Sequence, residues 1–489
     1  MARLVIISNR VAVPRAGNRA GGLEVAVLAA LKKHPGIWFG WSGRVSSRGL
    51  ETKTIEADNI SYVLTDLPKE DYNEYYNGFA NRVLWPILHY RLDLAEFSRR
   101  DLGGYLRVNE HFANELHKIL KPDDVIWVHD YHLITLAKAL RERGHKNRIG
   151  FFLHTPFPPP EIITALPQHE RIIWSLSHYD LVGFQTEIDA ANYARYVETE
   201  CRYPLKGHWS YETGERRVKI GVFPVGIEVE SFSRMARRAA RSSFVNGVLS
   251  SLSGRAMIIG VDRLDYSKGI DARIDAFEHF LASNPEWHNN VTYLQITPKS
   301  RSTIQEYAEM ERLVSEKVGH VNGNYGEASW TPIRYIIRAH SRTALAGLYY
   351  ASRAALVTPL RDGMNLVAKE YVAAQNPENP GVLILSRFAG AALECKPALL
   401  VNPYDAASVG AAIARALSMP LQERCARHEA LFKIISQNDI DLWPDRFLSM
   451  LTGKTEPSQE RVAVQDAAPK DSGAQPYSSI GIPRALPGA

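Results

Sequence analysis

The chain has 489 residues, a formal net charge of +5, 45% hydrophobic residues and 23% charged residues. Its length exceeds what one hydrophobic core usually supports, so we expect two globular domains. Arg and Lys are spread along the sequence and do not gather in a stripe with interleaved aromatics. This distribution argues against a nucleic-acid-binding protein.

The three cysteines, Cys201, Cys395 and Cys425, form neither a CxxC pair nor a metal-binding spacing, which indicates reduced thiols in a cytosol. The first residues, MARLVIISNR, lack a charged-then-apolar leader and are typical of a β-strand. No apolar run approaches the roughly 20 residues that a membrane-spanning helix requires. We therefore expect a cytoplasmic protein with neither a membrane nor a nucleic acid as partner.

Short runs of Val, Ile, Leu and Phe recur along the chain, separated by helix-length amphipathic stretches. Runs of this kind without alternation are typical of parallel strands buried on both faces of a sheet. In the first half the expected strands are Leu4–Ser8, Ile37–Trp41, Val125–His129, Ile149–Leu153, Leu181–Phe184 and Ile220–Phe223. In the second half they are Ala256–Val261, Val291–Ile296, Ala355–Thr358, Val382–Leu385 and Ala398–Val401.

This order of elements predicts an α/β protein with two domains, 1–235 and 236–453. The boundary is expected in the polar segment 226–250, because a new series of strands and helices begins at Ala256. Residues 454–489 are rich in Pro, Gly, Ser, Ala and Gln and almost lack large apolar side chains. They cannot bury enough surface to offset chain entropy, so we expect a disordered tail.

Polar residues follow several of the expected strands, at the sheet edge where open α/β folds bind ligands. They are Arg10, Gly21, Gly22, Asp130, His154, Arg263, Lys268, Lys299, Arg301, Arg361, Asp362, Gly363 and Glu370. Each residue alone is weak evidence, but five strand ends together present cations, carboxylates and glycines. None of these strand ends offers a metal site.

The residue types at these strand ends suit the binding of a nucleotide sugar. Arg263 and Lys268, five residues apart in one strand-to-helix loop, could stabilise a leaving diphosphate without Mg²⁺. Asp362 could bind sugar hydroxyls, and Glu370 could bind both hydroxyls of a ribose.

A second anionic ligand is expected opposite the first. Arg10 and Arg301 come from opposite halves of the chain, and arginine suits bidentate contacts with phosphate. Two anionic ligands that meet between two domains predict the transfer of a group from one to the other.

Six motifs in this order make the chain recognisable. They are SNR followed by AGGL, YYNGFANRVLWPILHY, WVHDYHL, FFLHTPFP, GVDRLDYSKG and TPLRDGMNLVAKEYVAAQ. Together they resemble the trehalose-6-phosphate synthase family, from about residue 3 to about residue 450. The resemblance implies a GT-B fold, with two Rossmann-like domains and a C-terminal helix that crosses back to the first. It also implies a retaining transfer of glucose from UDP-glucose to glucose 6-phosphate, which gives α,α-trehalose 6-phosphate without a metal or other cofactor.

The resemblance also implies roles for matching residues. The donor-binding residues are Gly21, Gly22, Arg263, Lys268, His340, Asp362, Gly363, Met364, Asn365, Leu366, Val367, Ala368, Lys369 and Glu370. The acceptor-binding residues are Arg10, Tyr76, Trp85, Asp130 and Arg301. Trp85 and His154 shape the anomeric pocket. The catalytic set is Asp130, His154, Arg263, Lys268 and Asp362.

The family further implies front-face attack, in which the leaving phosphate helps to deprotonate the acceptor hydroxyl, and a cytoplasmic homotetramer that serves osmoprotection. Alternatives on the same frame are a glucosylglycerol-phosphate synthase and a pseudo-glycosyltransferase, which would differ around Tyr76, Trp85 and Asp130. A non-catalytic regulatory module is a more distant alternative, but every donor position carries the expected residue type. The sequence leaves open whether the donor base is uracil, adenine or guanine.

Overall fold

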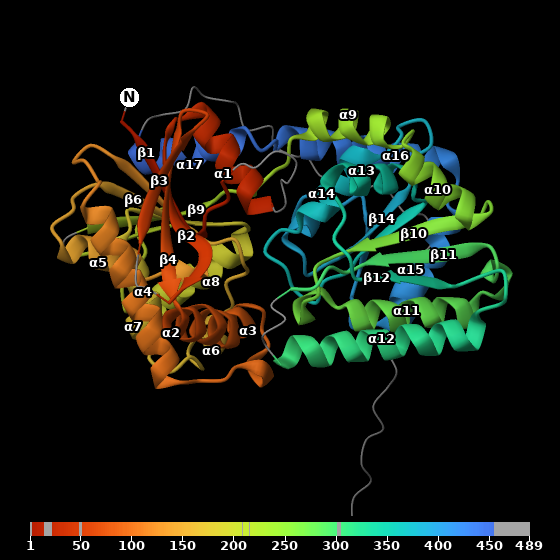
Figure 1. Cartoon of the computed structure of the whole chain (residues 1–489), viewed down its shortest axis with the longest axis horizontal. Helices are drawn as coiled ribbons and strands as arrows, with labels where there is room; N and C mark the ends of the chain where they lie inside the picture. The colour runs from red at the N-terminus through yellow and green to blue at the C-terminus, as the bar shows by residue number, and fades with distance from the viewer. Residues whose placement is uncertain are drawn as a thin grey trace, which may run out of the picture. The chain divides into compact units, whose positions relative to one another are not determined.

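The computed structural model describes residues 2–13, 22–47, 51–207, 209–214, 216–300 and 305–453. These residues form two β-sheets, one of nine strands and one of six, each flanked by helices (Figure 1). Gly21, Arg301 and the tail 454–489 lie outside the described residues. Within the described part, no helix is long and apolar enough to cross a membrane.

The first sheet has the order β3-β4-β2-β1-β5-β6-β7-β9-β8. Its described strands are β1 (Leu4–Arg10), β2 (Gly36–Ser46), β3 (Thr52–Ala57), β4 (Ile60–Pro68), β5 (Val125–His129), β6 (Arg148–Phe152), β7 (Leu181–Phe184), β8 (Ser210–Thr213) and β9 (Arg216–Val222). The strands are parallel except for the antiparallel edge pairs β3–β4 and β8–β9.

Both faces of this sheet are buried, as its continuous apolar strands predict. Val5 and Ile7 of β1 belong to one apolar cluster, whereas Leu4 and Ile6 belong to another. Residues that alternate along a strand point to opposite faces, so each cluster fills one side. The first cluster includes residues of η1 (Tyr72–Leu84), α3 (Trp85–Leu88), α4 (Arg99–His117), α5 (Leu136–Glu142) and α8 (Glu187–Thr199). The second includes residues of α1 (Gly22–Lys33) and α17 (Leu442–Thr452).

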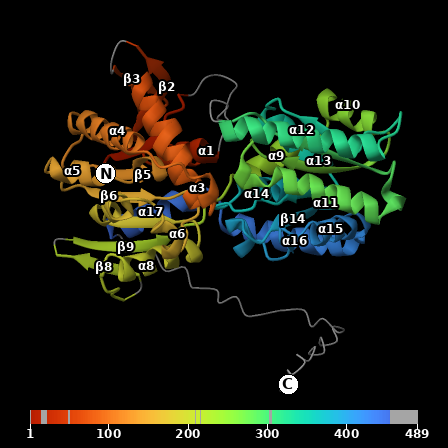
Figure 2. The same cartoon turned by 90° about the horizontal axis from the view of Figure 1, so that it is seen from below.

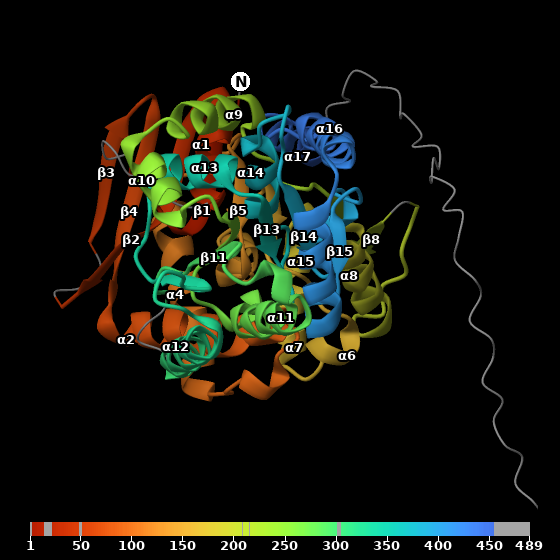
Figure 3. The same cartoon turned by 90° about the vertical axis from the view of Figure 1, so that its right-hand side faces the viewer.

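The second sheet is wholly parallel and has the order β12-β11-β10-β13-β14-β15. Its described strands are β10 (Ala256–Val261), β11 (Val291–Ile296), β12 (Ile333–Ile336), β13 (Ala354–Val357), β14 (Val382–Ser386) and β15 (Leu399–Val401). Figures 1 and 3 show two groups of helices on opposite sides of it. One group contains α9 (Val229–Ala239), α13 (Arg342–Ala351), α14 (Leu366–Ala374) and α16 (Leu421–Gln437). The other contains α11 (Ile270–Ser283), α12 (Gln305–Tyr325) and α15 (Ala406–Ser418).

The last described helix, α17, returns to the first sheet, as expected (Figures 1 and 2). Its buried side chains Trp443, Phe447 and Leu451 belong to the apolar cluster of β1 and β5. The ring of Phe447 stacks on Trp127 with 4.4 Å between centroids. The preceding helix, α16, packs instead against the second sheet through Leu431 and Ile435. This crossing ties the end of the folded chain to its beginning.

Every expected strand is present, and the structure adds β3, β4, β8 and β12. The added strands lack a continuous apolar run. β3 and β8 are edge strands with exposed residues, β12 is half-buried, and β4 mixes buried with half-buried residues along its length. The polar segment near the boundary forms two helices, α9 and α10 (Ser243–Leu252), and the Ser242 side chain caps the start of α10. The remaining short helices are α2 (Lys69–Asp71), α6 (Pro160–Ile163) and α7 (His169–Ile173).

Candidate functional site

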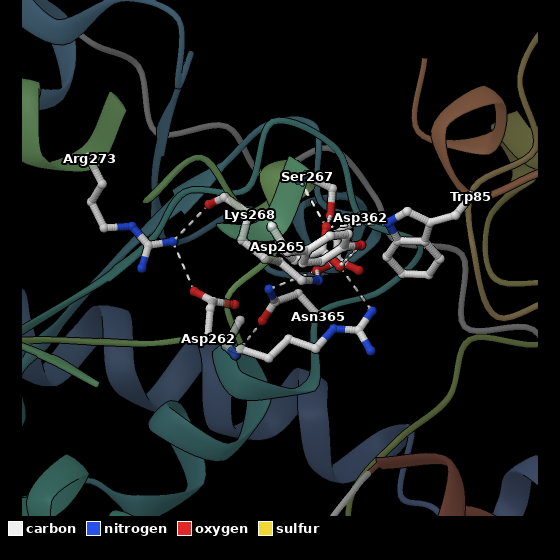
Figure 4. A network of polar contacts seen from close by, with 11 residues as sticks. Trp85, Asp262, Asp265, Ser267, Lys268, Arg273, Asp362 and Asn365 are labelled. Atoms are coloured by element: carbon white, nitrogen blue, oxygen red, sulfur yellow. Dashed lines mark hydrogen bonds and ion pairs between the residues drawn. The ribbon is translucent and has the colours of Figure 1, made fainter. Parts of the chain in front are cut away.

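The loop after β10 holds a cation against the loop after β13. Lys268 ends the short 3-10 helix η5 (Tyr266–Lys268), and Gly269, with φ +60°, turns the chain into α11. The Lys268 Nζ lies 2.5 Å from the Asp362 Oδ2, and the Asn365 Nδ2 donates to the same oxygen at 3.0 Å (Figure 4). Both expected groups, the cation and the carboxylate, therefore meet at the carboxyl ends of neighbouring strands.

Asp265 organises the same loop, although sequence reasoning did not single it out. Its side chain is fully buried, and its Oδ1 accepts hydrogen bonds from the Ser267 backbone N–H at 3.0 Å and the Ser267 Oγ at 2.8 Å. Trp85, in the first half of the chain, donates from its Nε1 to the same Oδ1 at 3.3 Å. The Tyr307 hydroxyl donates to Oδ2 at 3.3 Å. Asp265 thus joins α3, α12 and the β10 loop (Figure 4).

The guanidinium of Arg263 lies beside both the Asp265 carboxylate and the Trp85 ring. Its Nη2 is 3.4 Å from the Asp265 Oδ2, and its centre lies 4.8 Å from the centroid of the Trp85 ring. The side chain of Arg263 is 41% exposed, so it can reach a bound anion. A cation held by one carboxylate and one aromatic ring is oriented before any ligand arrives.

The segment from Asp362 to Glu370 enters α14 through an unusual turn. Asn365 has φ 77°, and its side-chain oxygen accepts a hydrogen bond from the Ala368 N–H at 3.2 Å, which caps the helix. A Cβ at Gly363 would lie 2.1 Å from the His154 carbonyl oxygen, so only glycine permits this close approach. The first turn of α14 leaves other backbone N–H groups for an anionic or hydroxylated ligand.

The side chains further along α14 face different surroundings. Glu370 accepts from the Arg342 Nε at 3.3 Å, and burial raises its pKa against the lowering effect of Arg342. Lys369 is fully buried, and its Nζ donates to the Val225 carbonyl at 2.9 Å and pairs with Glu394. The side chain of Lys369 therefore contacts the linker between the sheets. Only the backbone of Lys369 is left to contact a donor.

The expected base-binding residue His340 lies before α13 and packs on Phe244, with 5.5 Å between the ring centroids. Its Nε2 is buried without a hydrogen-bond partner within the described part of the chain. Met364 is buried in the loop before α14, and Leu366 and Val367 in the first turn of that helix are half-buried.

The expected acceptor residues gather at the carboxyl ends of β1, β5 and β6. Asp130 has φ 76°, and its Oδ1 accepts from the His154 N–H at 3.3 Å. Tyr76, on η1, stacks on Tyr72 with 5.6 Å between centroids, and also stacks on His132. Arg10 ends β1, with its guanidinium over the backbone of Gly43, where a Cβ would lie 2.8 Å from it. Gly22 begins α1.

His129 is fully buried, its neighbour His154 is half-buried, and both are uncharged. Their Nε2 and Nδ1 atoms lie 3.2 Å apart, so one ring donates to the other. Burial lowers the pKa of His154 to about 3. Burial and the neighbouring His154 also hold the pKa of His129 well below 6.5. His154 therefore presents a neutral ring and its backbone carbonyl, at Gly363, to the site.

We expect the buried histidines to make the fold less stable in acid. Below pH 6.5 the unfolded chain binds protons that the folded chain does not, so the free energy of unfolding falls as the pH falls. Each such histidine contributes about 1.4 kcal/mol per pH unit until its folded pKa is reached. His129→Phe should therefore shrink the loss between pH 6.5 and 5.0 by roughly 2 kcal/mol, as measured by urea unfolding. An unchanged loss would mean that His129 is charged in the folded state.

Several observations define what this site can bind. It brings together Lys268, Arg263 and the first turn of α14 on one side, and Asp130, Tyr76 and His154 on the other. The described residues contain no group of three or more His, Cys, Asp or Glu that could hold a metal ion. Fixed cations and helix amides can stabilise a leaving diphosphate.

This fold and site define the class of glycosyltransferases with two Rossmann-like sheets, the GT-B fold. The chain belongs to glycosyltransferase family 20, whose sequence model matches residues 8–453. It is 52% identical over 461 residues to a trehalose-6-phosphate synthase of Sinorhizobium fredii, with 93% of this chain and 99% of that protein aligned.

Solved structures agree. A Burkholderia xenovorans UDP-forming α,α-trehalose-phosphate synthase in complex with glucose-6-phosphate is 44% identical, with a TM-score of 0.90. The alignment covers 92% of this chain and 100% of that one. An E. coli protein bound with UDP-2-fluoro glucose is also 44% identical, with a TM-score of 0.88, over 92% of this chain and 99% of that one.

Proposed function

We propose that this chain transfers glucose from UDP-glucose to glucose 6-phosphate and releases UDP and α,α-trehalose 6-phosphate. The observation that carries the proposal is the Lys268–Asp362 pair at the start of the α14 loop, opposite the Asp130 and Tyr76 group. The relatives named above, with their glucose-6-phosphate and UDP-2-fluoro glucose complexes, support both substrates.

In this proposal, the donor diphosphate binds Lys268 and Arg263, whose charges stabilise the oxygen that gains charge as the sugar bond breaks. When the diphosphate binds, Lys268 exchanges part of its contact with Asp362 for phosphate. Asp362 then accepts from sugar hydroxyls, and Glu370 accepts from the ribose. The acceptor hydroxyl attacks from the face that the diphosphate leaves, so the configuration is retained and the leaving phosphate oxygen takes the proton. No protein nucleophile is required.

A substrate matrix tests the proposal. UDP-, ADP- and GDP-glucose are each paired with glucose 6-phosphate, glycerol 3-phosphate and free glucose, and nucleotide release is followed. We expect rapid turnover only for UDP-glucose with glucose 6-phosphate. Preference for glycerol 3-phosphate would instead identify a glucosylglycerol-phosphate synthase, and absence of turnover in every pair would support a regulatory module.

Metal removal gives a separate prediction. We expect full activity in saturating EDTA, because Lys268 and Arg263 supply the positive charge that Mg²⁺ supplies in other transferases. The measurement is the initial rate with and without EDTA. A loss that Mg²⁺ or Mn²⁺ restores would show that a metal shares the diphosphate site.

The family resemblance also supports assignments beyond the reaction. We propose a homotetramer in the cytoplasm that makes trehalose 6-phosphate for osmoprotection. We also propose two domains, 1–235 and 236–453, since each segment contains its own sheet, with α9 spanning the boundary and packing against the second sheet. Sedimentation analysis of the full chain measures the oligomeric state.

A further inference from the structure

An open cavity of about 410 Å³ lies at the edge of the second sheet that is remote from the Lys268–Asp362 pair. Ala256 and Met257 at the start of β10, and Gly381 just before β14, line it. Lys268 and Asp362 follow the opposite, carboxyl ends of β10 and β13. The cavity is therefore separate from the donor and acceptor residues.

Three arginines line this cavity and donate only to backbone carbonyls. The Arg255 Nε donates to the Asn289 carbonyl at 3.0 Å, and its other nitrogens donate to further carbonyls. The Arg353 Nη2 donates to the carbonyls of Leu417 and Met419 at 3.0 and 3.1 Å. The Arg424 Nη1 donates to the Pro380 carbonyl. Within the described part of the chain, none of the three pairs with a carboxylate.

The charge of these arginines is therefore uncompensated. Arg424 is 7% exposed, and its Nε is buried without a partner among the described residues. Burial and the positive charge of Arg424 lower the pKa of Arg353. Arginine does not lose its proton in proteins, so the two like charges persist. Buried charge without an opposite charge is costly, and a bound anion would remove that cost.

The rest of the cavity suits the organic part of a small anion. Trp287 and Tyr350 contribute half-buried aromatic side chains, and Leu249 adds an aliphatic one. Asn376 and Asn379 contribute amides that can donate to hydroxyls or phosphate oxygens. A volume of about 410 Å³ falls within the size range of small-molecule sites.

We propose that this cavity binds a small organic phosphate, with the phosphate on Arg353 and Arg424 and the organic group against Trp287 and Tyr350. Arginine pairs bind phosphate through parallel hydrogen bonds, whereas the aromatic surface favours an organic ester over the free ion. The cavity and the donor loop lie at opposite ends of α14, a helix of nine residues or about 14 Å. The ligand therefore binds alongside the substrates and does not compete with them.

The test uses the full chain without glucose 6-phosphate, because that sugar phosphate is itself a small organic phosphate and would occupy the cavity, and the protected peptides separate binding at the cavity from binding at the catalytic site. Ribose 5-phosphate, inorganic phosphate and acetate are titrated by calorimetry, and hydrogen exchange maps the peptides that contain Arg353, Asn376 and Arg424. We expect ribose 5-phosphate to bind more tightly than inorganic phosphate, acetate not to bind, and protection to centre on these peptides.

Variants assign the binding to the arginines. We expect Arg353→Gln to weaken ribose 5-phosphate binding by about ten-fold or more, because a hydrogen-bonded charge is lost. Arg424→Gln, at the other arginine assigned to the phosphate, is the second variant, for use if loss of the Leu417 and Met419 contacts impairs folding of Arg353→Gln. Arg415→Gln is the control, since Arg415 is exposed and pairs with Glu423.

Three results would overturn the proposal. They are the absence of protection at these peptides, equal binding of acetate, and unchanged affinity in both cavity variants. Any of these would leave the arginines as caps for backbone carbonyls. Because exchange is mapped to peptides, a failure here is distinct from a failure of the proposed reaction.

Discussion

Lys268→Ala should lower kcat by about 10²–10³-fold while changing the KM for UDP-glucose much less. The Lys268 side chain is 12% exposed and its ammonium group lies 2.5 Å from the Asp362 carboxylate, so its position is fixed before the donor binds. Its charge is needed most when the diphosphate leaves, and an interaction of this kind acts on kcat. Steady-state kinetics with varied UDP-glucose measure both constants.

Lys317→Ala is the matched control for this variant. Lys317 also pairs with an aspartate, Asp275, in the second half of the chain. Lys317 lies on α12 and Asp275 lies on α11, so neither belongs to the loops of the candidate site. We expect it to leave kcat unchanged. A Lys268→Ala enzyme that keeps most of its kcat would remove Lys268 from the reaction. Asp362 keeps its hydrogen bond from Asn365 in the variant, so the fold should survive.

The second large effect is expected at Asp265. Asp265→Ala should cost about 3–5 kcal/mol of unfolding free energy, because it removes a fully buried carboxylate and leaves its donors unsatisfied. The donors include the Trp85 indole, the Ser267 backbone and hydroxyl, and the Tyr307 hydroxyl. Urea unfolding measures the loss, and Asp275→Ala, which removes a half-exposed carboxylate, is the control.

Asp265→Asn separates a positioning role from stability. The amide oxygen can still accept from Trp85 and Ser267, but the side chain no longer carries the charge that lies beside Arg263. We expect a smaller loss of stability together with a clear fall in kcat, because Arg263 is no longer held in one orientation. If kcat stays at the wild-type value, Asp265 has a structural role only.

The fold was largely predictable because its central strands are continuous apolar runs. β10 and β14, for example, are buried along almost their whole length, and burial on both faces leaves the sequence no alternation. β3 was not predicted, since five of its six residues are exposed and its pairing with β4 depends on a hairpin. Tyr72–Leu84 forms a π-helix, for which the apolar spacing gives no signal.

The candidate site was predictable where polar residues follow a strand, as at Lys268 and Asp362. The role of Asp265 was not, because its burial depends on Trp85, which lies 180 residues earlier in the chain. Lys369 is the opposite case, a predicted binding residue whose side chain has a structural contact instead. Its place in the α14 motif suggests a ligand contact, but its side chain binds Val225 and Glu394.

The most direct test of the account is the structure of the product. UDP-glucose and glucose 6-phosphate are incubated with the enzyme, and the anomeric protons are followed by NMR. We predict one disaccharide phosphate with two α-anomeric protons and a 1,1 linkage, formed in step with UDP. Free glucose released with UDP, or a β-anomeric proton in the product, would contradict the proposed transfer.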